Sequence, residues 1–491
     1  MNPLKQLAGQ TAVYGMGTIV PRLLNFLLLT PFYTRVFVKG EYGTVTELYA
    51  YVAFLMVLLT YGMETAYFRF VENAKNKDKV YTTALTSLFT TSTLFVILVV
   101  IFAQPLADII RYSANVEYII YFAFIIGIEA FTSIPFARLR QLQKPGRFAF
   151  IKIVNVLVNI FLNFFFLWLC PYLLKSNPDS IVGLVYSENI GVGYAFISNL
   201  VATVVTLLLL IPDIIKTKIQ FDSALLRSML TYSLPLLVVG LAGMVNEVSD
   251  KIFLKYLWPD RATALDQVGI YGACFRLAVL MTLFTQMFRY AAEPFFFAQA
   301  KEKNSKTVYA DVMKYFIIFG LIIFLVVMLY IDIFKYFIGS GFHEGLFIVP
   351  IVLFANLFLG IFYNLSVWYK LTNLTRYGAV IAICGAAITI VLNIVLIPKI
   401  GYLGSAWAHF TCYLVMVVIS YFWGKKYFPI NYDLKRIFLY VLLALVLYTI
   451  SNYIKPEQFI MQLLVNTALL TIFLATVYRF EKPNLAKSSY Q

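Results

Sequence analysis

The sequence predicts an all-α polytopic membrane protein with about fourteen transmembrane helices. Hydrophobic residues make up 61% of the 491 residues, and charged residues make up only 13%. Soluble domains carry about 25% charged residues. Apolar runs near 20 residues recur along the whole chain, and a helix of that length crosses a bilayer. The runs do not alternate in polarity as the strands of a membrane β-barrel do.

Each apolar run is expected to be one membrane-spanning helix, because only short polar segments separate the runs. Their expected limits are 11–33, 44–68, 81–103, 117–137, 150–174, 190–212, 231–257, 268–291, 312–334, 346–369, 377–398, 402–424, 436–454 and 459–479. The first run is too long for the core of a signal peptide and lacks a cleavage pattern, so we expect it to remain as an anchor. No polar segment is long enough to form a core of its own.

The basic residues alternate between the two sides of the predicted membrane. Of the 39 Lys and Arg residues, 27 fall in segments on the N-terminal side and 10 on the opposite side. Cytoplasmic loops carry an excess of Lys and Arg, so both termini are predicted to be cytoplasmic. The net charge of +15 then reflects membrane orientation, and nucleic acid is not an expected partner.

Short similarities relate the first six predicted spans to the next six. Asn163 closes an apolar run in the fifth span as Asn393 does in the eleventh, and Gly193 opens the sixth span as Gly404 opens the twelfth. An even number of spans per copy produces parallel repeats related by an axis along the membrane normal, which typically rock around a site between them. The expected domains are a six-helix lobe over 1–220, a second lobe over 221–430, and two extra helices with a short cytoplasmic tail over 431–491.

Two arginines interrupt apolar runs, Arg22 in the first span and Arg276 in the eighth. A cation at the bilayer centre costs about 2.5–3.5 kcal/mol on insertion scales, so it usually faces a bundle interior or a water-filled cavity. A guanidinium matches phosphate oxygens in fork geometry, which predicts substrate binding. Pro21 weakens the helix before Arg22 and favours a local bend. The alternative is a structural pair with an intramembrane carboxylate, for which the sequence offers Glu47, Glu64 and Glu129.

Three carboxylates and one arginine are further candidates for gating or ion pairing. Glu64 and Glu293 occupy similar positions near the predicted cytoplasmic ends of the second and eighth spans. Each is expected either to form a gate with a nearby arginine, Arg69 or Arg289, or to be an ordinary interfacial carboxylate. Glu129 lies deeper, in the fourth span, and needs a partner or a proton, which suggests ion pairing or proton coupling.

Polar residues near the outer end of the seventh span form another candidate group. Glu247 lies three residues before Asp250 and four before Lys251, so the three share one helix face. One interpretation is a local salt bridge beside the membrane surface. The other is a cation site for coupling to Na⁺ or H⁺, because carboxylate and amide oxygens suit a hard cation. That site would be formed by Asn246, Glu247, Asp250 and Asn393.

Catalytic and metal-binding motifs are missing from the sequence. The chain has only two histidines and contains no HExxH, P-loop or GxSxG sequence, which are the patterns of common metal, nucleotide and hydrolase sites. Its four cysteines have no CxxC spacing and are expected to be buried thiols. We therefore expect neither an enzyme nor a bound metal or cofactor.

Two stretches resemble a known family. The sequence LNIVLIPKIGYLGSAWA from Leu392 to Ala408 is similar to the junction of the eleventh and twelfth spans in polysaccharide flippases of the multidrug/oligosaccharidyl-lipid/polysaccharide (MOP) superfamily. The sequence PFYTRVF from Pro31, with Glu41-Tyr42-Gly43, is similar to their junction of the first two spans. The resemblance extends over the whole chain in span count, loop pattern and repeat layout.

The resemblance implies a V-shaped bundle of two six-helix lobes that works by alternating access. It implies a flippase of the bacterial inner membrane that carries undecaprenyl-diphosphate-linked oligosaccharides to the periplasmic leaflet for O-antigen (lipopolysaccharide), capsule or exopolysaccharide assembly. Cavity cations hold the diphosphate in this family, and Arg22 and Arg276 match the spans where lipid II flippases place arginines. The implied partners are the lipid-linked glycan, the bilayer, and polymerase and chain-length proteins.

Three alternatives have different sequence requirements. A lipid II flippase has more cavity arginines than the two seen here. A drug/cation antiporter of the same fold needs a carboxylate in its first lobe, typically in the first span, which here contains no Asp or Glu. A membrane-embedded O-antigen polymerase or ligase needs a large outer loop with catalytic residues, and the outer loops here are short.

Overall fold

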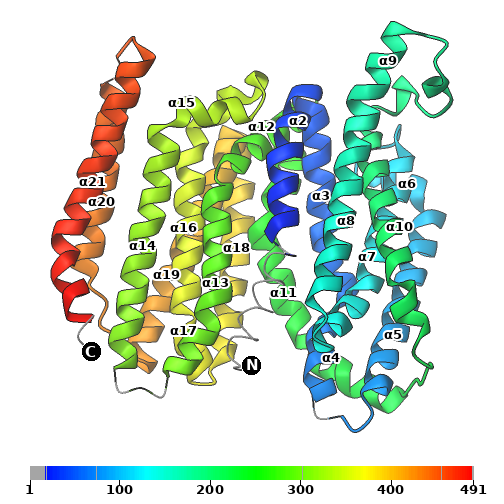
Figure 1. Ribbon diagram of the computed structural model, residues 1–491, viewed down its shortest axis with the longest axis horizontal. Helices are drawn as coiled ribbons and strands as arrows, with labels where there is room; N and C mark the ends of the chain where they lie inside the picture. The colour runs from blue at the N-terminus through cyan, green and yellow to red at the C-terminus, as the bar shows by residue number, and fades with distance from the viewer. Residues whose placement is uncertain are drawn as a thin grey trace. The chain divides into compact units, whose positions relative to one another are not determined.

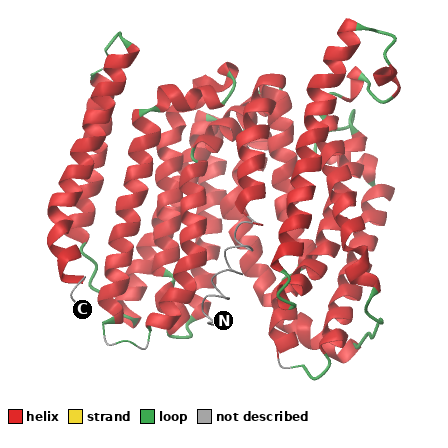
Figure 2. Cartoon of the chain, in the orientation of Figure 1, coloured by secondary structure: helices red, strands yellow, loops and turns green. Residues whose placement is uncertain are grey.

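The computed structural model describes residues 17, 19–72, 74–300, 302, 304–454 and 456–488. Within these residues the regular structure is helical throughout, without a strand (Figure 2). Twelve helices are long and apolar enough to cross a membrane, or thirteen if a bent pair counts as one span. These coincide with the second to the fourteenth predicted spans and confirm the all-α membrane class. The first predicted span, 11–33, lies partly outside the described residues.

The chain divides into two compact units, and the first extends from Met1 to Met244 (Figure 1). Its helix α5 packs on α7, and α10 packs on both α7 and α8. A buried core that includes Tyr67, Tyr81 and Leu88 joins α4 and α5 to α7. The helices of this unit are α2 (Thr30–Val36), α3 (Lys39–Thr60), α4 (Met63–Glu72), α5 (Lys77–Ile101), α6 (Ala103–Ile109), α7 (Val116–Gln141), α8 (Pro145–Phe164), α9 (Cys170–Ser176), α10 (Gly193–Ile215) and the first part of α11 (Ser223–Leu257).

Two prolines in this unit each follow a π-helical turn. The turn η1 (Asn25–Leu29) comes before Pro31, and the turn η2 (Phe165–Leu169) comes before Pro171. A proline has no N–H for the carbonyl four residues earlier, and its ring crowds that carbonyl. Because a π turn is wider than an α turn, it accommodates the proline without ending the helix. The two membrane spans therefore continue past their prolines.

The second unit extends from Val245 to Gln491. Its helix α19 packs on both α16 and α18, and α14 packs on α16, α20 and α21. Its helices are the remainder of α11, α12 (Ala264–Leu277), α13 (Val279–Gln299), α14 (Ser305–Leu329), α15 (Ile331–Phe334), α16 (Val349–Leu365), α17 (Val367–Leu371), α18 (Thr375–Ile400), α19 (Tyr402–Tyr427), α20 (Leu434–Tyr453) and α21 (Phe459–Ser488).

The eighth predicted span is not one regular helix. Helices α12 and α13 meet at Ala278 with a bend of 57°. The Ala278 N–H bonds the carbonyl of Phe275, three residues earlier, which tightens the end of α12. Leu277, Ala278 and Met281 are almost fully buried, so tertiary packing fixes this break. The sequence has no proline or glycine at this point, and for that reason the pattern predicted a continuous span.

The division into units differs from the expected domains. The boundary between Met244 and Val245 lies inside α11, and the second unit includes α20 and α21. The expected lobes over 1–220 and 221–430 refer to an internal repeat, whereas the two units reflect local packing alone. The repeat and its boundary near residue 220 therefore stay predictions.

Candidate functional site

Four charged side chains interact with one ammonium group in the first unit. Lys152 lies near the start of α8, and it interacts electrostatically with Glu129 and Arg140 of α7, with Glu64 of α4, and with Arg22 of the helical residues 19–24. We call these five residues the unit 1 charge cluster. It brings three cations and two carboxylates together from four helical segments.

An ion pair and an aromatic contact hold Arg140 in this cluster. Its guanidinium binds the Glu64 carboxylate at 2.5 Å and lies 5.1 Å from the centre of the Phe68 ring. The sequence suggested Arg69 as a partner for Glu64. In the structure Arg69 instead stacks on Tyr232, with 4.1 Å from its Cζ to the ring centre. The ion-pair partner of Glu64 in this unit is therefore Arg140.

Lys152 and Arg140 are site residues that sequence reasoning missed. Both were counted with the loop charges that orient the chain. Lys152 lies only two residues inside the predicted span 150–174, and its Nζ stands 4.1 Å from the centre of the Phe136 ring. The sequence does contain one indication of such a residue, because a carboxylate as deep in the membrane as Glu129 needs a charged partner or a proton. Arg22 is exposed in the described part of the unit, and the adjacent Pro21 is buried.

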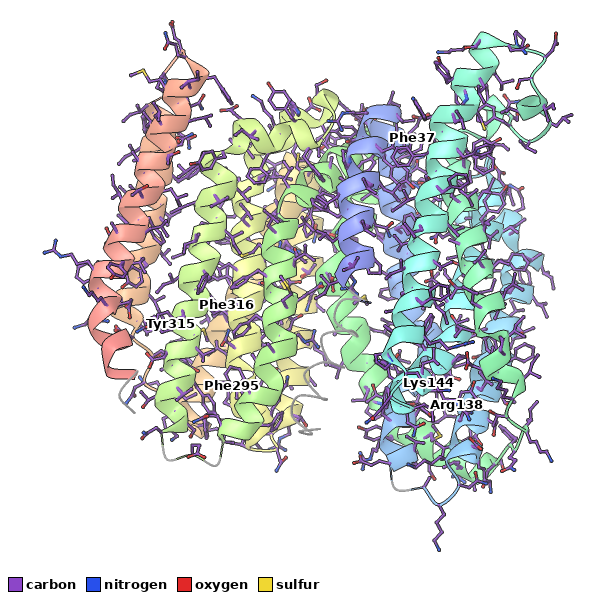
Figure 3. The ribbon with its side chains drawn as sticks, in the orientation of Figure 1. Phe37, Arg138, Lys144, Phe295, Tyr315 and Phe316 are labelled. Carbon is purple, nitrogen blue, oxygen red and sulfur yellow. The ribbon has the colours of Figure 1, made fainter. Side chains whose placement is uncertain are left out.

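The same end of the unit carries further basic residues. Figure 3 labels Arg138 and Lys144, which lie where α7 turns into α8. Arg138 binds Asp78 at 2.8 Å. The Lys79 ammonium donates to the Asp222 carboxylate at 2.6 Å, which lowers the pKa of Asp222. These contacts link the ends of α5, α7 and α11 where the sequence predicts a cytoplasmic surface.

A buried carboxylate in the second unit contacts three polar side chains. Asp250 of α11 is 2% exposed. Its Oδ1 lies 3.1 Å from the Lys251 ammonium, and its Oδ2 accepts a hydrogen bond from the Tyr271 hydroxyl at 2.5 Å. The Nδ1 of His409 stands 3.8 Å from the same Oδ2. The carboxylate thus already holds an ammonium group and a hydroxyl.

The amide side chains of Asn246 and Asn393, which were predicted to complete a cation site, bond to residues other than Asp250. The Thr389 hydroxyl donates to Asn246 Oδ1 at 3.4 Å, Asn393 donates to the Thr389 carbonyl at 2.7 Å, and Ser405 donates to Asn393 at 3.1 Å. Glu247 is exposed. Within the described part of the chain, no three or more His, Cys, Asp or Glu side chains are grouped to hold a metal.

Three more predicted residues lie on the bent pair α12 and α13. Arg276 is exposed and stands in the last turn of α12, where a cation interacts favourably with the helix dipole. Arg289 stacks on Tyr363, with 4.7 Å from its Cζ to the ring centre. The side chain of Glu293 lies outside the described residues, so its predicted gate with Arg289 stays a prediction.

Asn163 and Asn393, matched in the sequence as repeat positions, make the same kind of bonds in their own units. Each donates from Nδ2 to the carbonyl four residues earlier, at 2.8 and 2.7 Å. Each also accepts from a hydroxyl on another helix: Tyr33 at 2.7 Å for Asn163, and Ser405 at 3.1 Å for Asn393. Both side chains are completely buried. Their hydroxyl partners come from the first and the twelfth spans, which the predicted repeat does not match, so the repeat stays a prediction.

Comparisons with known proteins agree on family and fold. A family model described as "Polysaccharide biosynthesis protein" matches residues 7–298. No curated protein sequence matches the chain. Among solved structures, "Lipid II flippase MurJ, inward closed conformation" is similar with a TM-score of 0.73 and 17% identity, over 95% of this chain and 99% of that chain.

Two further structures carry the MOP superfamily name. An inward-facing multidrug resistance MATE family transporter has a TM-score of 0.62 and 13% identity, over 85% of this chain and 97% of its own. A transporter from Pyrococcus furiosus, noted for the reverse polarity of its binding pocket, has a TM-score of 0.54 and 12% identity, over 86% and 94%. At these identities the likeness concerns the fold, which is that of MOP transporters.

Proposed function

Because this chain belongs to the polysaccharide biosynthesis protein family and has the fold of MOP transporters, we propose that it is an oligosaccharide-lipid flippase. It moves undecaprenyl-diphosphate-linked oligosaccharide from the cytoplasmic to the periplasmic leaflet of a bacterial inner membrane. The glycan then enters O-antigen, capsule or exopolysaccharide assembly, where polymerase and chain-length proteins are the expected partners. Alternating access moves the substrate, with coupling to H⁺ or Na⁺.

The unit 1 charge cluster is the observation that carries this proposal. Three cations and two carboxylates leave the cluster one positive charge in excess. The helices α4, α7 and α8 that carry four of them belong to candidate membrane spans. Charges at membrane depth are costly and usually mark a substrate or ion pathway. Guanidinium and ammonium groups bind phosphate oxygens through charge-assisted hydrogen bonds. A diphosphate can therefore exchange for the carboxylate partners while the polyprenyl chain stays in lipid.

The alternative transporters call for different charges. A cation antiporter of this fold typically needs a carboxylate in the first span, and the first span of this chain carries Arg22 and no acidic residue. The solved lipid II flippase shares the fold at 17% identity. That likeness does not identify the glycan that this chain would carry. Lipid II is therefore tested beside the oligosaccharide substrate.

The deciding experiment measures translocation in proteoliposomes that contain the purified full-length protein. The substrate is a fluorescent undecaprenyl-diphosphate oligosaccharide, and a membrane-impermeant quencher reports its leaflet. Wild-type protein is expected to move this substrate, whereas Arg22→Gln and Arg276→Gln slow transport by about 10- to 100-fold, because a hydrogen bond to a charged group contributes about 1.5–3 kcal/mol. Arg22→Lys retains the charge but loses the fork geometry, so we expect an intermediate rate.

Arg227→Gln is the matched control, since Arg227 is an exposed arginine near the start of α11. It is expected to transport at the wild-type rate. Wild-type transport by both Arg22→Gln and Arg276→Gln, each with an unchanged melting temperature, would refute the proposed role of these arginines. Transport of lipid II in place of the oligosaccharide would assign the alternative substrate.

A further inference from the structure

A groove at one end of the first unit lies between the α4–α5 connection and the end of α7. Its volume is about 570 Å³, and its described lining residues include three cations, Lys75, Lys77 and Arg138. The same lining includes one carboxylate, Asp78. Three cations against one carboxylate leave a net charge of +2, which makes the field in the groove positive.

The excess charge of the groove belongs to its two lysines. Arg138 binds Asp78 at 2.8 Å, and its Cζ lies 4.0 Å from the centre of the Tyr81 ring, so this arginine and the carboxylate balance each other. Lys75 and Lys77 are exposed, and neither forms an ion pair with another described residue. Two ammonium groups are therefore available to a ligand in the groove.

Aromatic packing fixes the floor of the groove. Tyr67 of α4 and Tyr81 of α5 are each 1% exposed, and their ring centres are 6.3 Å apart. The Tyr67 hydroxyl donates to Gln141 Oε1 of α7 at 3.4 Å. Because these contacts already hold the three helices together, the floor does not need to rearrange when a ligand binds, which reduces the entropic cost of binding.

Both walls of the groove lie where the membrane surface is expected. Only positions 73–76 separate the candidate spans Lys39–Glu72 and Lys77–Ile101, and only positions 142–144 separate Val116–Gln141 from Pro145–Ser176. A connection this short between two spans stays close to the lipid headgroups. Leu142, which also lines the groove, is 43% exposed and adds an apolar side chain to the lining.

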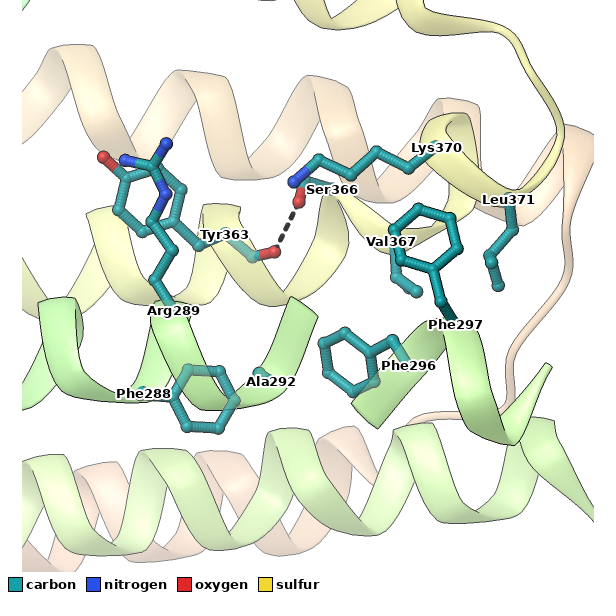
Figure 4. Close-up of a pocket in the computed structure, with 10 residues that line it drawn as sticks. All are labelled: Phe288, Arg289, Ala292, Phe296, Phe297, Tyr363, Ser366, Val367, Lys370 and Leu371. Carbon is teal, nitrogen blue, oxygen red and sulfur yellow. Dashed lines mark hydrogen bonds between the residues drawn. The ribbon is translucent and has the colours of Figure 1, made fainter. Parts of the chain in front are cut away.

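A pocket in the second unit also has two cations in its lining but offers much less space. Arg289 and Lys370 line this pocket between α13, α16 and α17 (Figure 4), and its volume is about 20 Å³, which is enough for about one water molecule. Arg289 lies over the Tyr363 ring, 4.7 Å from its centre, and Lys370 also has an interaction partner. A phosphate group does not fit there, whereas the groove of the first unit combines space with available ammonium groups.

We infer that the groove of the first unit binds the headgroup of an anionic phospholipid from the adjacent leaflet, which the sequence predicts to be the cytoplasmic one. Lys75 and Lys77 donate charge-assisted hydrogen bonds to the phosphate oxygens, and the acyl chains stay in the bilayer. Basic residues directly beside membrane spans attract anionic lipids. A zwitterionic headgroup carries its own ammonium group, which the lysines repel. This inference does not depend on the proposed function.

The test is photocrosslinking of the purified full-length protein in detergent micelles with a photoreactive phosphatidylglycerol below saturation, followed by peptide mapping. Crosslinks are expected within 67–81 and 138–142. The double variant Lys75→Gln/Lys77→Gln is expected to lower their yield at least about tenfold, because each lysine strengthens binding to anionic lipid by about fivefold. The matched control is Lys216→Gln/Lys218→Gln, since these two lysines are also exposed, are also two positions apart, and lie outside the groove lining. It is expected to retain the wild-type yield.

Competition identifies the ligand. Unlabelled phosphatidylglycerol is expected to reduce the crosslink, whereas phosphatidylcholine and inorganic phosphate at the same concentration leave it unchanged. Equal competition by either of the latter two would overturn the assignment to an anionic headgroup, as would an unchanged yield in Lys75→Gln/Lys77→Gln or an equal loss in the control.

Two further variants separate charge from folding and this site from transport. Lys75→Arg/Lys77→Arg preserves the charge and is expected to retain the crosslink, and a loss in this variant as well would contradict the role of charge. Arg22→Gln is expected to slow transport and leave the crosslink intact, so the two proposals fail independently.

Discussion

At the scale of single residues, the informative side chains are charges in apolar helices that have found partners. Lys152 interacts with carboxylates and cations from three other helical segments, and Asp250 holds Lys251 and Tyr271. Removing one member of a buried ion pair lowers the unfolding free energy by more than the intact pair contributes to it, because the other charge is left uncompensated. Function and structural pairing are therefore separated by removing both partners together.

The pair of Glu129 and Lys152 allows such a separation. We expect Lys152→Gln to lower both the melting temperature and the transport rate. The double variant Glu129→Gln/Lys152→Gln leaves no uncompensated charge, so the melting temperature recovers, while transport stays at least about tenfold below wild type because a phosphate ligand is lost. Thermal unfolding in detergent and the proteoliposome assay measure the two quantities.

Arg147→Gln/Asp213→Gln is the matched control for that double variant, since it removes another pair joining α8 to α10, at 2.7 Å. It is expected to transport normally. Full transport by Glu129→Gln/Lys152→Gln would mean that Lys152 has a structural role alone.

At the scale of elements, polar contacts place helices that hydrophobic patterns leave undetermined. Tyr33 donates to Asn163 at 2.7 Å, which joins α2 to α8 beside the π turns η1 and η2. In the second unit, Asn466 of α21 donates to the Leu329 carbonyl of α14 and accepts from Ser451 of α20. Between helices in lipid these bonds matter because apolar surface by itself provides little preference for one partner.

Glu481 of α21 is expected to dominate the docking of the two C-terminal helices. It is 2% exposed, lies 2.8 Å from Lys314 Nζ of α14, and accepts from Tyr440 of α20 at 2.8 Å. Glu481→Ala leaves the buried Lys314 without this carboxylate, so we expect a loss of about 3–5 kcal/mol of unfolding free energy. Chemical denaturation in mixed micelles measures this loss.

Asp433→Ala is the comparison, because it removes an exposed pair with Arg436 at 3.2 Å and the N-cap bond that Asp433 accepts from the Arg436 N–H at the start of α20. An N-cap contributes about 0.5–2 kcal/mol. Exposed pairs contribute about 0–1 kcal/mol. Equal losses of unfolding free energy in the two variants would show that burial does not determine how much these ion pairs stabilise the protein.

At the scale of the whole molecule, the predicted orientation follows from the alternation of basic residues between loops. From Lys39 onward, the structure has one helical span for each crossing that this alternation requires. The eighth crossing is a bent pair of helices. The cytoplasmic location of both termini stays a prediction, since it depends on the positive-inside rule.

Cysteine labelling in whole cells tests that orientation. In a Cys384→Ser background, the cysteines introduced at exposed positions by Asp179→Cys and Glu457→Cys are expected to react with a membrane-impermeant maleimide in intact cells. The cysteines introduced by Lys218→Cys and Lys425→Cys are expected to react only after permeabilisation. The other three native cysteines are buried, which keeps the background low.

The reverse labelling pattern would mean that the chain is inserted in the opposite orientation. Labelling of both sets in intact cells would contradict the predicted number of spans between them.

The sequence by itself determined the membrane class, the spans and the unusual charges. Long apolar runs have one stable solution in lipid, where each backbone group must bond inside its own helix. Arg22, Glu64 and Glu129 were visible for the same reason, because a charge interrupts such a run.

Only the tertiary structure decided which charges meet. The sequence assigned Lys152 to a loop, whereas the packing of α7 and α8 brings it near Glu129. Glu64 pairs with Arg140, which is 76 residues away in the chain. The break at Ala278 also depends on packing between helices that are distant in the chain. Side-chain contacts of this kind arise from helix placement, and the hydrophobic pattern of a single helix specifies which face is apolar but not which neighbour covers it.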